Sequence, residues 1–440
     1  MSATLVHRKV LTPNGAVYRA ERAEPGRKVE FLASTDIWFR PVKMTNTPDG
    51  TLLVLDMYRE TTEHPWSIPD DIKSHLDLTS GKDRGRLFEI IPDGFDASKR
   101  GWPKLEKAST GTLIALLSSL ESWPRETAQR LLLARRDPSA IAALQGLAET
   151  GPTPQGRLHA LWTLESLGGL TDALVLKALS DIEPGVRENA AKLAEERSPA
   201  NGHNSSIHEK RLDAAADRDA MVRFQTALSL GFVTSPRRLK ALAAIAEKDA
   251  ADPWTRAAAL SAVGDDASRF LDKSLAGLHD GKPGGGRAWL EDTAALIAAR
   301  NRPDETEGVL KRLGEGKADP GAASAVLIGL QRGNIQAGVV GLLHKGNIAP
   351  LLGLFNRAEA VAFDDQTIAD RIEAIRLLGL SFEVRHQFGL DRLLDAREPV
   401  EVQVEAIRTR ALKLFGAEVK TGRGGVIAFI RSIPALAPAR

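Results

Sequence analysis

The sequence contains no cysteine. Disulfide bridges, thiolate zinc or iron–sulfur ligation, a cysteine nucleophile and a C-x-x-C-H haem attachment are therefore excluded within these 440 residues. The absence does not fix a redox compartment, because many exported proteins also lack cysteine.

Long apolar runs and an excess of one charge are also missing. No stretch approaches about 18 uninterrupted apolar residues, and the first residues, MSATLVHRKVL, contain no apolar leader core. We therefore expect neither a signal peptide nor a membrane span. The 59 basic side chains nearly balance the 57 acidic ones, which gives no reason to expect a nucleic-acid partner.

Residues 1–95 alternate between apolar and polar side chains in the manner of β-strands. "TLVHRKVL" and "AVYRAERA" flank the turn tripeptide at 13–15, and "RPVKMTNT" and "TLLVLDM" flank the one at 48–50, so each pair predicts a hairpin. "KVEFLAS" and "GRLFEIIP" add further strands. Residues 57–84 interrupt this pattern as an insertion, with a short helix predicted at 67–78.

Five or six short antiparallel strands resemble the last one to two blades of a β-propeller. An isolated part of a propeller leaves sheet edges open, so we expect the missing propeller blades in a longer parent chain. Residues 96–107 are predicted to link this partial propeller to the rest.

From about residue 108 the apolar period changes to 3.6, and an arginine recurs at the start of successive apolar helices. The spacing of 30 to 36 residues is that of a repeated helix pair. Residues 108–300 are therefore predicted to form an α-solenoid, in which each repeat buries its apolar face against its neighbours. The recurring arginines are Arg125, Arg157, Arg187, Arg223, Arg256 and Arg287.

Prolines and alanines mark the same helices. A proline three residues before the arginine suits a first helical turn, and an alanine three residues after it allows close helix approach. The prolines are Pro154, Pro184 and Pro253, and the alanines are Ala128, Ala160, Ala190 and Ala259. The pattern weakens at 280–286 and returns faintly at Arg371 and Gln403, so 301–440 is predicted to hold degenerate helical repeats and a loose C-terminal tail.

Two aspartates, Asp181 and Asp217, stand six residues before their arginines. We expect arginine and aspartate to form a ladder along the stack that satisfies helix ends. An exposed pair of this kind contributes about 0–1 kcal/mol, so the ladder is interpreted as structural and not as a binding site.

These patterns carry two family resemblances. The helices resemble HEAT repeats, clearly over 108–300 and weakly beyond. Residues 30–92 resemble the last blade of a bacterial family of membrane-bound dehydrogenases, because WFRP, PDG, DMYRE, HPWSIPDDI and GKDRGR occur in that order. Members of that family combine a glucose/sorbosone-dehydrogenase-like propeller, HEAT repeats and often a c-type haem domain. This chain lacks most of the propeller and the haem signature.

The resemblance implies a site at Arg40, at the start of the strand nearest the propeller axis. An arginine there can bind an anionic quinone cofactor or a substrate carboxylate with its planar fork, or it can support the insertion loop. Asp56 and Arg59 end the next strand, and they either extend such a site or pair with each other. No catalytic residue, metal ligand or cofactor is assigned to this chain alone. A member of this family would be periplasmic or at the cell surface.

The remaining polar residues are interpreted as ordinary surface or core residues without a functional role. Carboxylates and imidazoles gather in the insertion, but their spacing fits no metal-ligand pattern. They are Glu60, Glu63, His64, Asp70, Asp71 and His75. "TSGKDRGR" lacks the frame of a phosphate-binding loop and leads into a strand. His159, inside an apolar helix, is interpreted as a core histidine.

Two functions from different classes remain open. In the first, the chain is the C-terminal part of an exported dehydrogenase-like protein, of the PQQ-like quinoprotein type acting on a sugar or alcohol, with the HEAT repeats as a docking scaffold. In the second, it is a non-enzymatic scaffold whose concave solenoid face binds a protein and whose β segment is a cap. The chain alone is expected to be inactive, because residues around a central cofactor come from every blade.

Overall fold

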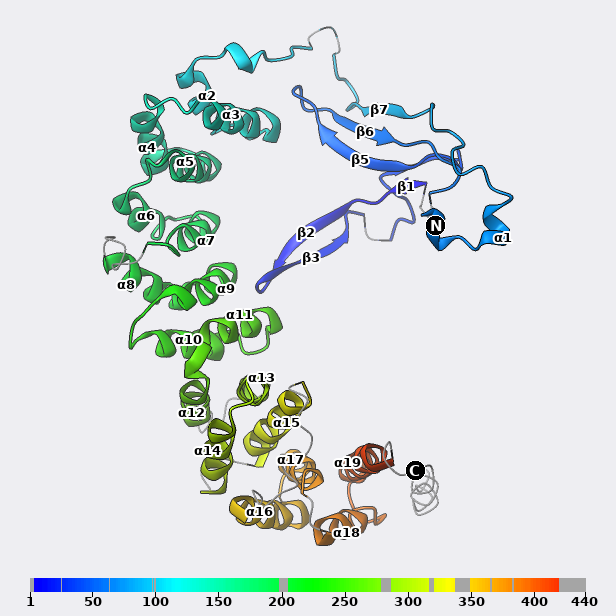
Figure 1. The fold of residues 1–440 in the computed structure, drawn as a ribbon, viewed down its shortest axis with the longest axis vertical. Helices are drawn as coiled ribbons and strands as arrows, with labels where there is room; N and C mark the ends of the chain where they lie inside the picture. The colour runs from blue at the N-terminus through cyan, green and yellow to red at the C-terminus, as the bar shows by residue number, and fades with distance from the viewer. Residues whose placement is uncertain are drawn as a thin grey trace. The chain divides into compact units, whose positions relative to one another are not determined.

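The computed structural model describes residues 4–24, 26–62, 64–96, 98, 100–197, 205–277, 286–315, 320–336, 349–364, 366–381 and 384–418. The chain divides into two compact units, Met1–Arg211 and Leu212–Arg440, each with a hydrophobic core of its own. The first unit begins with β-strands and continues into helices, and the described part of the second is helical (Figure 1).

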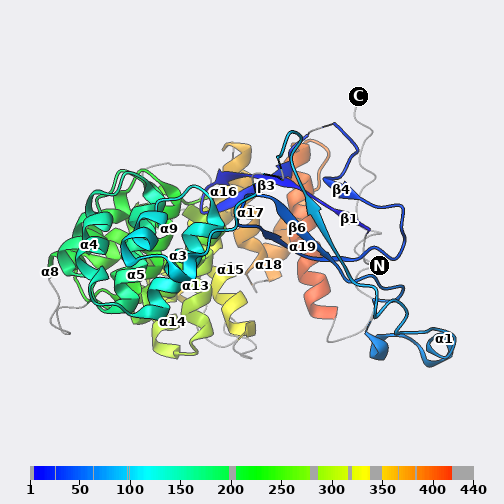
Figure 2. The same cartoon turned by 90° about the horizontal axis from the view of Figure 1, so that it is seen from above.

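The start of the first unit is an antiparallel β segment, as predicted (Figure 2). β2 and β3 form a separate hairpin, β1 pairs with β4, and β5, β6 and β7 form a three-stranded sheet in that order. The strands are β1 (Leu5–Val6), β2 (Lys9–Asn14), β3 (Val17–Arg22), β4 (Leu32–Ala33), β5 (Pro41–Asn46), β6 (Leu52–Asp56) and β7 (Arg86–Ile90).

Both predicted hairpins form around a glycine with positive φ. Two residues join β2 to β3, and one of them, Gly15, has φ +63°, which glycine adopts without steric cost. A longer loop joins β5 to β6, with Gly50 at φ +85°. The hydroxyl of Thr47 closes this loop by accepting the N–H of Thr51 at 2.9 Å.

The three-stranded sheet is apolar on both faces but buried on one. Val54 in β6 is fully buried, and Phe39, 3% exposed, packs edge-on against the phenylalanine of β7 with ring centroids 5.8 Å apart. On the other face, Leu53 and Leu55 are half-buried, and Leu87 beside them is 68% exposed. A strand with apolar residues on both faces is typical of a sheet covered on both sides.

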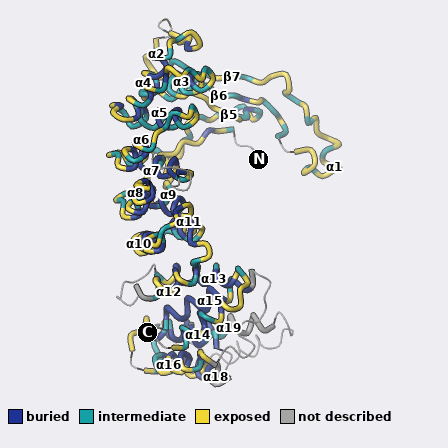
Figure 3. Tube along the Cα trace, turned by 60° about the vertical axis from the view of Figure 1, so that its left-hand side comes forward, coloured by how far each residue is buried: buried dark blue, intermediate teal, exposed yellow. Residues whose placement is uncertain are grey.

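The helix predicted over 67–78 is only one turn long. Its start is as expected, with Pro69 before α1 (Asp70–Lys73) and acidic residues in the first turn. Ile72 and Leu76 remain 51% and 38% exposed, so no buried face stabilises a longer helix. The preceding turn is the 3₁₀ helix η1 (Pro65–Ser67), and Figure 3 shows the exposure of this region.

The remainder of the first unit is a stack of helices around one core, which includes Leu113, Leu144 and Leu164, all fully buried. The helices are η3 (Leu105–Lys107), α2 (Thr110–Leu116), α3 (Ser122–Arg135), α4 (Ala140–Thr150), α5 (Pro154–Leu167), α6 (Asp172–Ala178) and α7 (Pro184–Leu193). α8 (Ser205–Asp213) lies across the division between the units.

The second unit continues the helix pairs around the larger core. Its first helices are η5 (Ala214–Ala216), α9 (Ala220–Ser229), η6 (Leu230–Phe232), α10 (Arg238–Lys248), α11 (Pro253–Val263), η7 (Gly264–Asp266), α12 (Ala267–Gly277) and α13 (Gly286–Ala299). Then follow α14 (Pro303–Gly314), α15 (Pro320–Gln336), η9 (Ala349–Leu351), α16 (Leu352–Phe363), α17 (Ile368–Gly379), α18 (Val384–Arg392) and α19 (Val400–Glu418).

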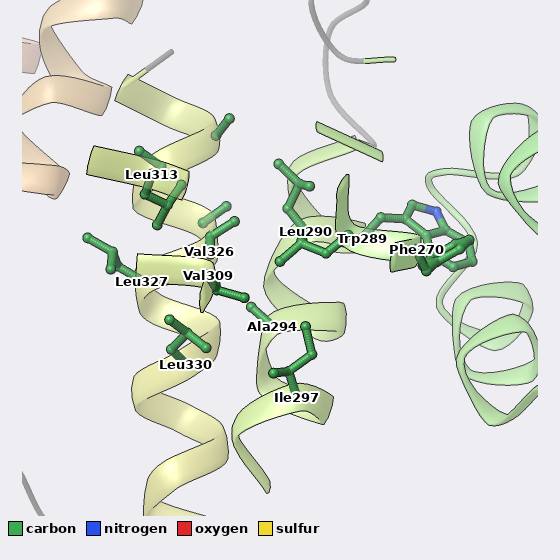
Figure 4. Close-up of a cluster of buried hydrophobic side chains, with 14 of the residues drawn as sticks. Phe270, Trp289, Leu290, Ala294, Ile297, Val309, Leu313, Val326, Leu327 and Leu330 are labelled. Atoms are coloured by element: carbon green, nitrogen blue, oxygen red, sulfur yellow. The ribbon is translucent and has the colours of Figure 1, made fainter. Parts of the chain in front are cut away.

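Two glycines allow α15 to lie very close to α13 in this core (Figure 4). A Cβ atom at Gly329 would lie 2.1 Å from the carbonyl oxygen of Glu291, and one at Gly333 would lie 2.1 Å from that of Ala295. Side chains four residues apart lie on one helix face, so this face of α15 admits no larger residue at either position.

Five of the six recurring arginines occupy equivalent places in the solenoid, as predicted, whereas the half-exposed Arg287 pairs with Glu373. In five repeats Nη1 donates to the backbone carbonyl six residues earlier, at the turn that precedes the helix. These carbonyls belong to Ser119, Gly151, Asp181, Asp217 and Ala250. The three prolines begin α5, α7 and α11, and the four alanines are fully buried.

A ladder of ion pairs also forms, with one difference from the expectation. The carboxylate of Asp181 binds Arg157 of the preceding repeat through two bonds of 2.7 Å, while its backbone carbonyl accepts Arg187. In the second unit Arg223 binds Asp249 in the same forked way. These side chains are 6–12% exposed, so the pairs are more enclosed than the exposed pairs assumed from the sequence.

The helix pairs continue to residue 418, with α17 and α19 as the later arginine-type helices. Arg371 donates to the carbonyl of Ala362 and to Glu398. Gln403 replaces the arginine in the last pair and donates to the carbonyl of Glu398 at 2.7 Å. The predicted loose tail, from residue 419, lies outside the described residues.

Within the described ranges, no helix is both long and apolar enough to cross a membrane. This agrees with the absence of a long apolar run in the sequence.

Candidate functional site

Asp56, at the end of β6, is the centre of the polar contacts around the predicted site residues. Its side chain is fully buried. One carboxylate oxygen accepts the backbone N–H groups of Arg40 at 2.7 Å and Tyr58 at 2.9 Å. The other accepts the guanidinium of Arg86 on β7, with Nε at 2.8 Å.

Hydrogen-bond donors stabilise the negative charge of the Asp56 carboxylate. Burial alone would raise the pKa of Asp56, but the N–H of Arg40, the Arg86 guanidinium and the N–H of Tyr58 together hold it below its usual value. Arg86 also donates to Asp36 at 3.1 Å. Its guanidinium carbon lies 4.1 Å from the centre of the Tyr58 ring, a distance favourable for a cation–π contact.

The same contacts hold a strained backbone in place. Tyr58 has φ +51°, a left-handed conformation that costs a non-glycine residue about 1–3 kcal/mol. Gly81, from the far end of the insertion, lies against it, and a Cβ there would be 2.3 Å from the Tyr58 carbonyl oxygen. Asp56 therefore holds both ends of the insertion, because it accepts the Tyr58 N–H at its start and the guanidinium of Arg86 just after its end.

The guanidinium of Arg40 is directed at its own backbone neighbourhood. Nη1 donates to the carbonyls of Ile37 and Phe39, and Nη2 donates to that of Glu60 at 3.1 Å. Nε is buried without a partner among the described residues. These contacts support the insertion loop, which was the alternative reading of Arg40, and its predicted role in anion binding stays a prediction.

Arg59 does not pair with Asp56, which instead binds Arg86. The backbone N–H of Arg59 bonds the carbonyl of Trp38 at 3.1 Å, and its side chain is half-buried with Nη1 unpaired within the described part of the chain. The sequence reasoning missed Arg86. The available signal was its place in the "GKDRGR" motif at the start of β7, because β6 and β7 pair with Asp56 opposite Arg86.

The polar residues of the insertion do not converge. His64 accepts the N–H of Trp66, and Asp70 pairs with Lys73. Among the described residues no group of three or more histidine or acidic side chains could hold a metal ion. Glu63 lies outside the described residues.

A hollow of about 150 Å³ lies at the base of the β2–β3 hairpin. Arg22 donates to Glu30 at 2.7 Å within it, and His7 bonds the other oxygen of Glu30 at 2.6 Å. Arg8 lies 5.7 Å from the centre of the Phe31 ring. The charged side chains around this hollow are therefore largely paired with one another.

A family model described as a domain of unknown function (DUF7133) matches residues 2–94. The matched range contains the whole β segment, with the insertion and the Asp56 contacts. The search of curated proteins finds no match. The comparisons therefore mark residues 2–94 as a recurring unit and assign no activity to it.

Proposed function

We propose that this chain is a docking scaffold within a dehydrogenase-like propeller assembly. Its β segment is completed by strands outside the described residues, and its HEAT-type helices hold a protein partner. The chemistry, with a quinone cofactor, belongs to the complete propeller.

The observation that carries this proposal is the exposure of the β segment. β2 is exposed at all six positions, β3 at five of six and β5 at five of six. The exposed apolar residues of these strands and of β7 are Val10, Leu11, Tyr18, Val42, Met44, Leu87 and Phe88. A β segment with so little buried area is marginal by itself, whereas sheets of a propeller are covered on both faces.

Open edges support the same conclusion. β5 and β7 are the outer strands of the three-stranded sheet within the described segment. Natural proteins protect such edges or pair them with further strands. Additional strands at an edge and a second sheet over Leu53, Leu55 and Leu87 would bury both the edge and the uncovered face.

Strand completion is tested with a longer chain. The coding sequence upstream of codon 1 is read and expressed together with residues 1–440, and hydrogen exchange of β2, β3 and β5 is compared in the two proteins. We expect these strands to gain protection at least tenfold in the longer chain. An upstream sequence without strands, or unchanged exchange, would reject this proposal.

Enzyme activity is tested on the same two proteins with a quinone cofactor, sugars or alcohols and an artificial electron acceptor. We expect no turnover from residues 1–440, since most of the residues around a central cofactor would be missing. Turnover by the short chain would contradict the proposal that the chemistry needs the complete propeller.

A non-enzymatic scaffold with a β cap is the second candidate. The contacts of Arg40 with three backbone carbonyls favour it, because they use the guanidinium for structure. Under this candidate Arg40→Ala lowers the melting temperature and leaves ligand affinity per folded molecule unchanged. Under the first candidate it weakens binding of the quinone by the longer chain about tenfold to a hundredfold.

A further inference from the structure

In the ladder of ion pairs the first arginine, Arg125, has no carboxylate partner among the described residues, and we call this position the open rung. Arg157, Arg223 and Arg256 each donate Nε to an aspartate of the following repeat. Arg125, the corresponding residue of α3, donates Nε to the ring nitrogen Nε2 of His159 at 3.1 Å instead. Its Nη1 is used for backbone carbonyls as in the other repeats.

His159 is a neutral partner in this arrangement. Its Nδ1 bonds the side-chain oxygen of Gln129 at 2.8 Å, so Nδ1 carries the proton and Nε2 accepts from Arg125. Burial, and then the charge of Arg125, lowers the pKa of His159. The positive charge of Arg125 is thus not balanced by an ion pair within the described residues.

The following turn cannot supply the missing carboxylate. The position six residues before the next arginine, where Asp181 stands one repeat later, is Gly151. A Cβ atom there would lie 2.5 Å from the carbonyl oxygen of Leu147. An aspartate at position 151 would therefore force the backbone to move, and this turn supplies no carboxylate to Arg125.

The open rung borders an exposed apolar residue. Arg125 is half-buried, and its Nη2 forms no hydrogen bond to a described residue and is not enclosed. Leu120, whose carbonyl accepts Nη1 of Arg125 at 3.1 Å, is 78% exposed. A free guanidinium edge beside an exposed leucine suits a carboxylate next to an apolar side chain.

We propose that Arg125 binds an aspartate or glutamate side chain of a protein partner, with an adjacent apolar side chain of that partner against Leu120. This site deepens the docking role proposed above and rests on it. The partner's carboxylate completes the ladder in the way that Asp181 completes it for Arg157.

The test begins with a random peptide library selected on the immobilised full chain. A fluorescently labelled selected peptide is then titrated with three variants. Arg125→Gln removes the cation. His159→Glu places an internal carboxylate beside Arg125, and a melting curve of this variant separates loss of binding from loss of stability. Arg130→Gln is the matched control, an exposed arginine on the same helix.

We expect the selected peptides to share an acidic residue beside an apolar one. Arg125→Gln and His159→Glu should each weaken binding about tenfold to a hundredfold, the usual effect of losing a charge-assisted hydrogen bond. Arg130→Gln should change it less than twofold, and replacing the acidic residue of the peptide by its amide should reproduce the loss.

Three results would overturn the site. They are selected peptides without an acidic residue, full affinity in His159→Glu, and competition by inorganic phosphate as strong as by the acidic peptide. Peptides that bind equally well to every variant would reject Arg125 but keep a docking function elsewhere on the chain. A library that yields no binder to any variant would reject the docking function as well.

Discussion

The ion pair between Arg157 and Asp181 provides the strongest test of the ladder. Both side chains are 12% exposed, and the guanidinium makes two bonds of 2.7 Å to the carboxylate. Asp181 also accepts the N–H of Glu183 at 2.9 Å. A charged hydrogen bond contributes about 1.5–3 kcal/mol, and breaking an enclosed pair leaves one charge unpaired.

We therefore expect Asp181→Asn to destabilise α5 and α7 locally by about 3 kcal/mol. The double-mutant cycle with Arg157→Gln should give a coupling energy of about 1.5–2 kcal/mol. The exposed pair Lys177–Glu149 is the control, because its side chains are 52% and 54% exposed. Its coupling should be less than about 0.5 kcal/mol.

Hydrogen exchange of the full chain, read by mass spectrometry, gives both couplings: α5 and α7 report the Arg157–Asp181 pair, and α4 and α6 report the Lys177–Glu149 control. Burial would raise the pKa of Asp181, but Arg157 and the Glu183 N–H outweigh it and lower the pKa. The pair's contribution is thus present above the unfolded-state pKa of about 3.9 and is lost as the pH falls through the folded-state value. Equal couplings for the enclosed and exposed pairs would refute this account of the ladder.

Three further outcomes are expected. Burial and then a neighbouring guanidinium lower the pKa of His159, so the stability that its neutral ring contributes is full above about pH 6.5 and is lost as the pH falls below it. The fall in melting temperature between neutral and mildly acid pH should therefore be smaller in His159→Gln. Gly81→Ala should destabilise the β segment by more than about 1 kcal/mol in hydrogen exchange, and Gly94→Ala, with positive φ but open space around it, should cost less. Asp56→Asn should raise the exchange rates of β5 and β6 about a hundredfold through loss of the Arg86 pair, and rates unchanged from wild type would contradict the structural role of that carboxylate.

The helical part could be predicted because its signals are local. Pro154 and Pro184 begin α5 and α7, and the recurring arginine lies one turn inside each of these helices. The sequence pattern also returned faintly at Gln403, where no arginine stands. The structure shows why glutamine serves there, because its side-chain amide donates to the carbonyl of Glu398.

The contacts of the β segment were harder to predict because they join distant residues. Asp56 binds Arg86 across the whole insertion, and only the pairing register of β6 with β7 places them opposite each other. Proximity in sequence suggested Arg59 instead. The length of α1 was overestimated for a related reason, because its start depends on local residues but its extent depends on a surface against which Ile72 could be buried.

The central claim is that the described helices bury their apolar faces against one another, whereas β2 and β3 leave theirs exposed. Hydrogen exchange of residues 1–440 tests it most directly, with amides of β2 and β3 compared with those of α5 and α13. We predict that the two strands exchange fully while the buried turns of both helices remain protected by at least a thousandfold more, since local stability follows buried apolar contacts. Strands protected as strongly as the helices would contradict this claim.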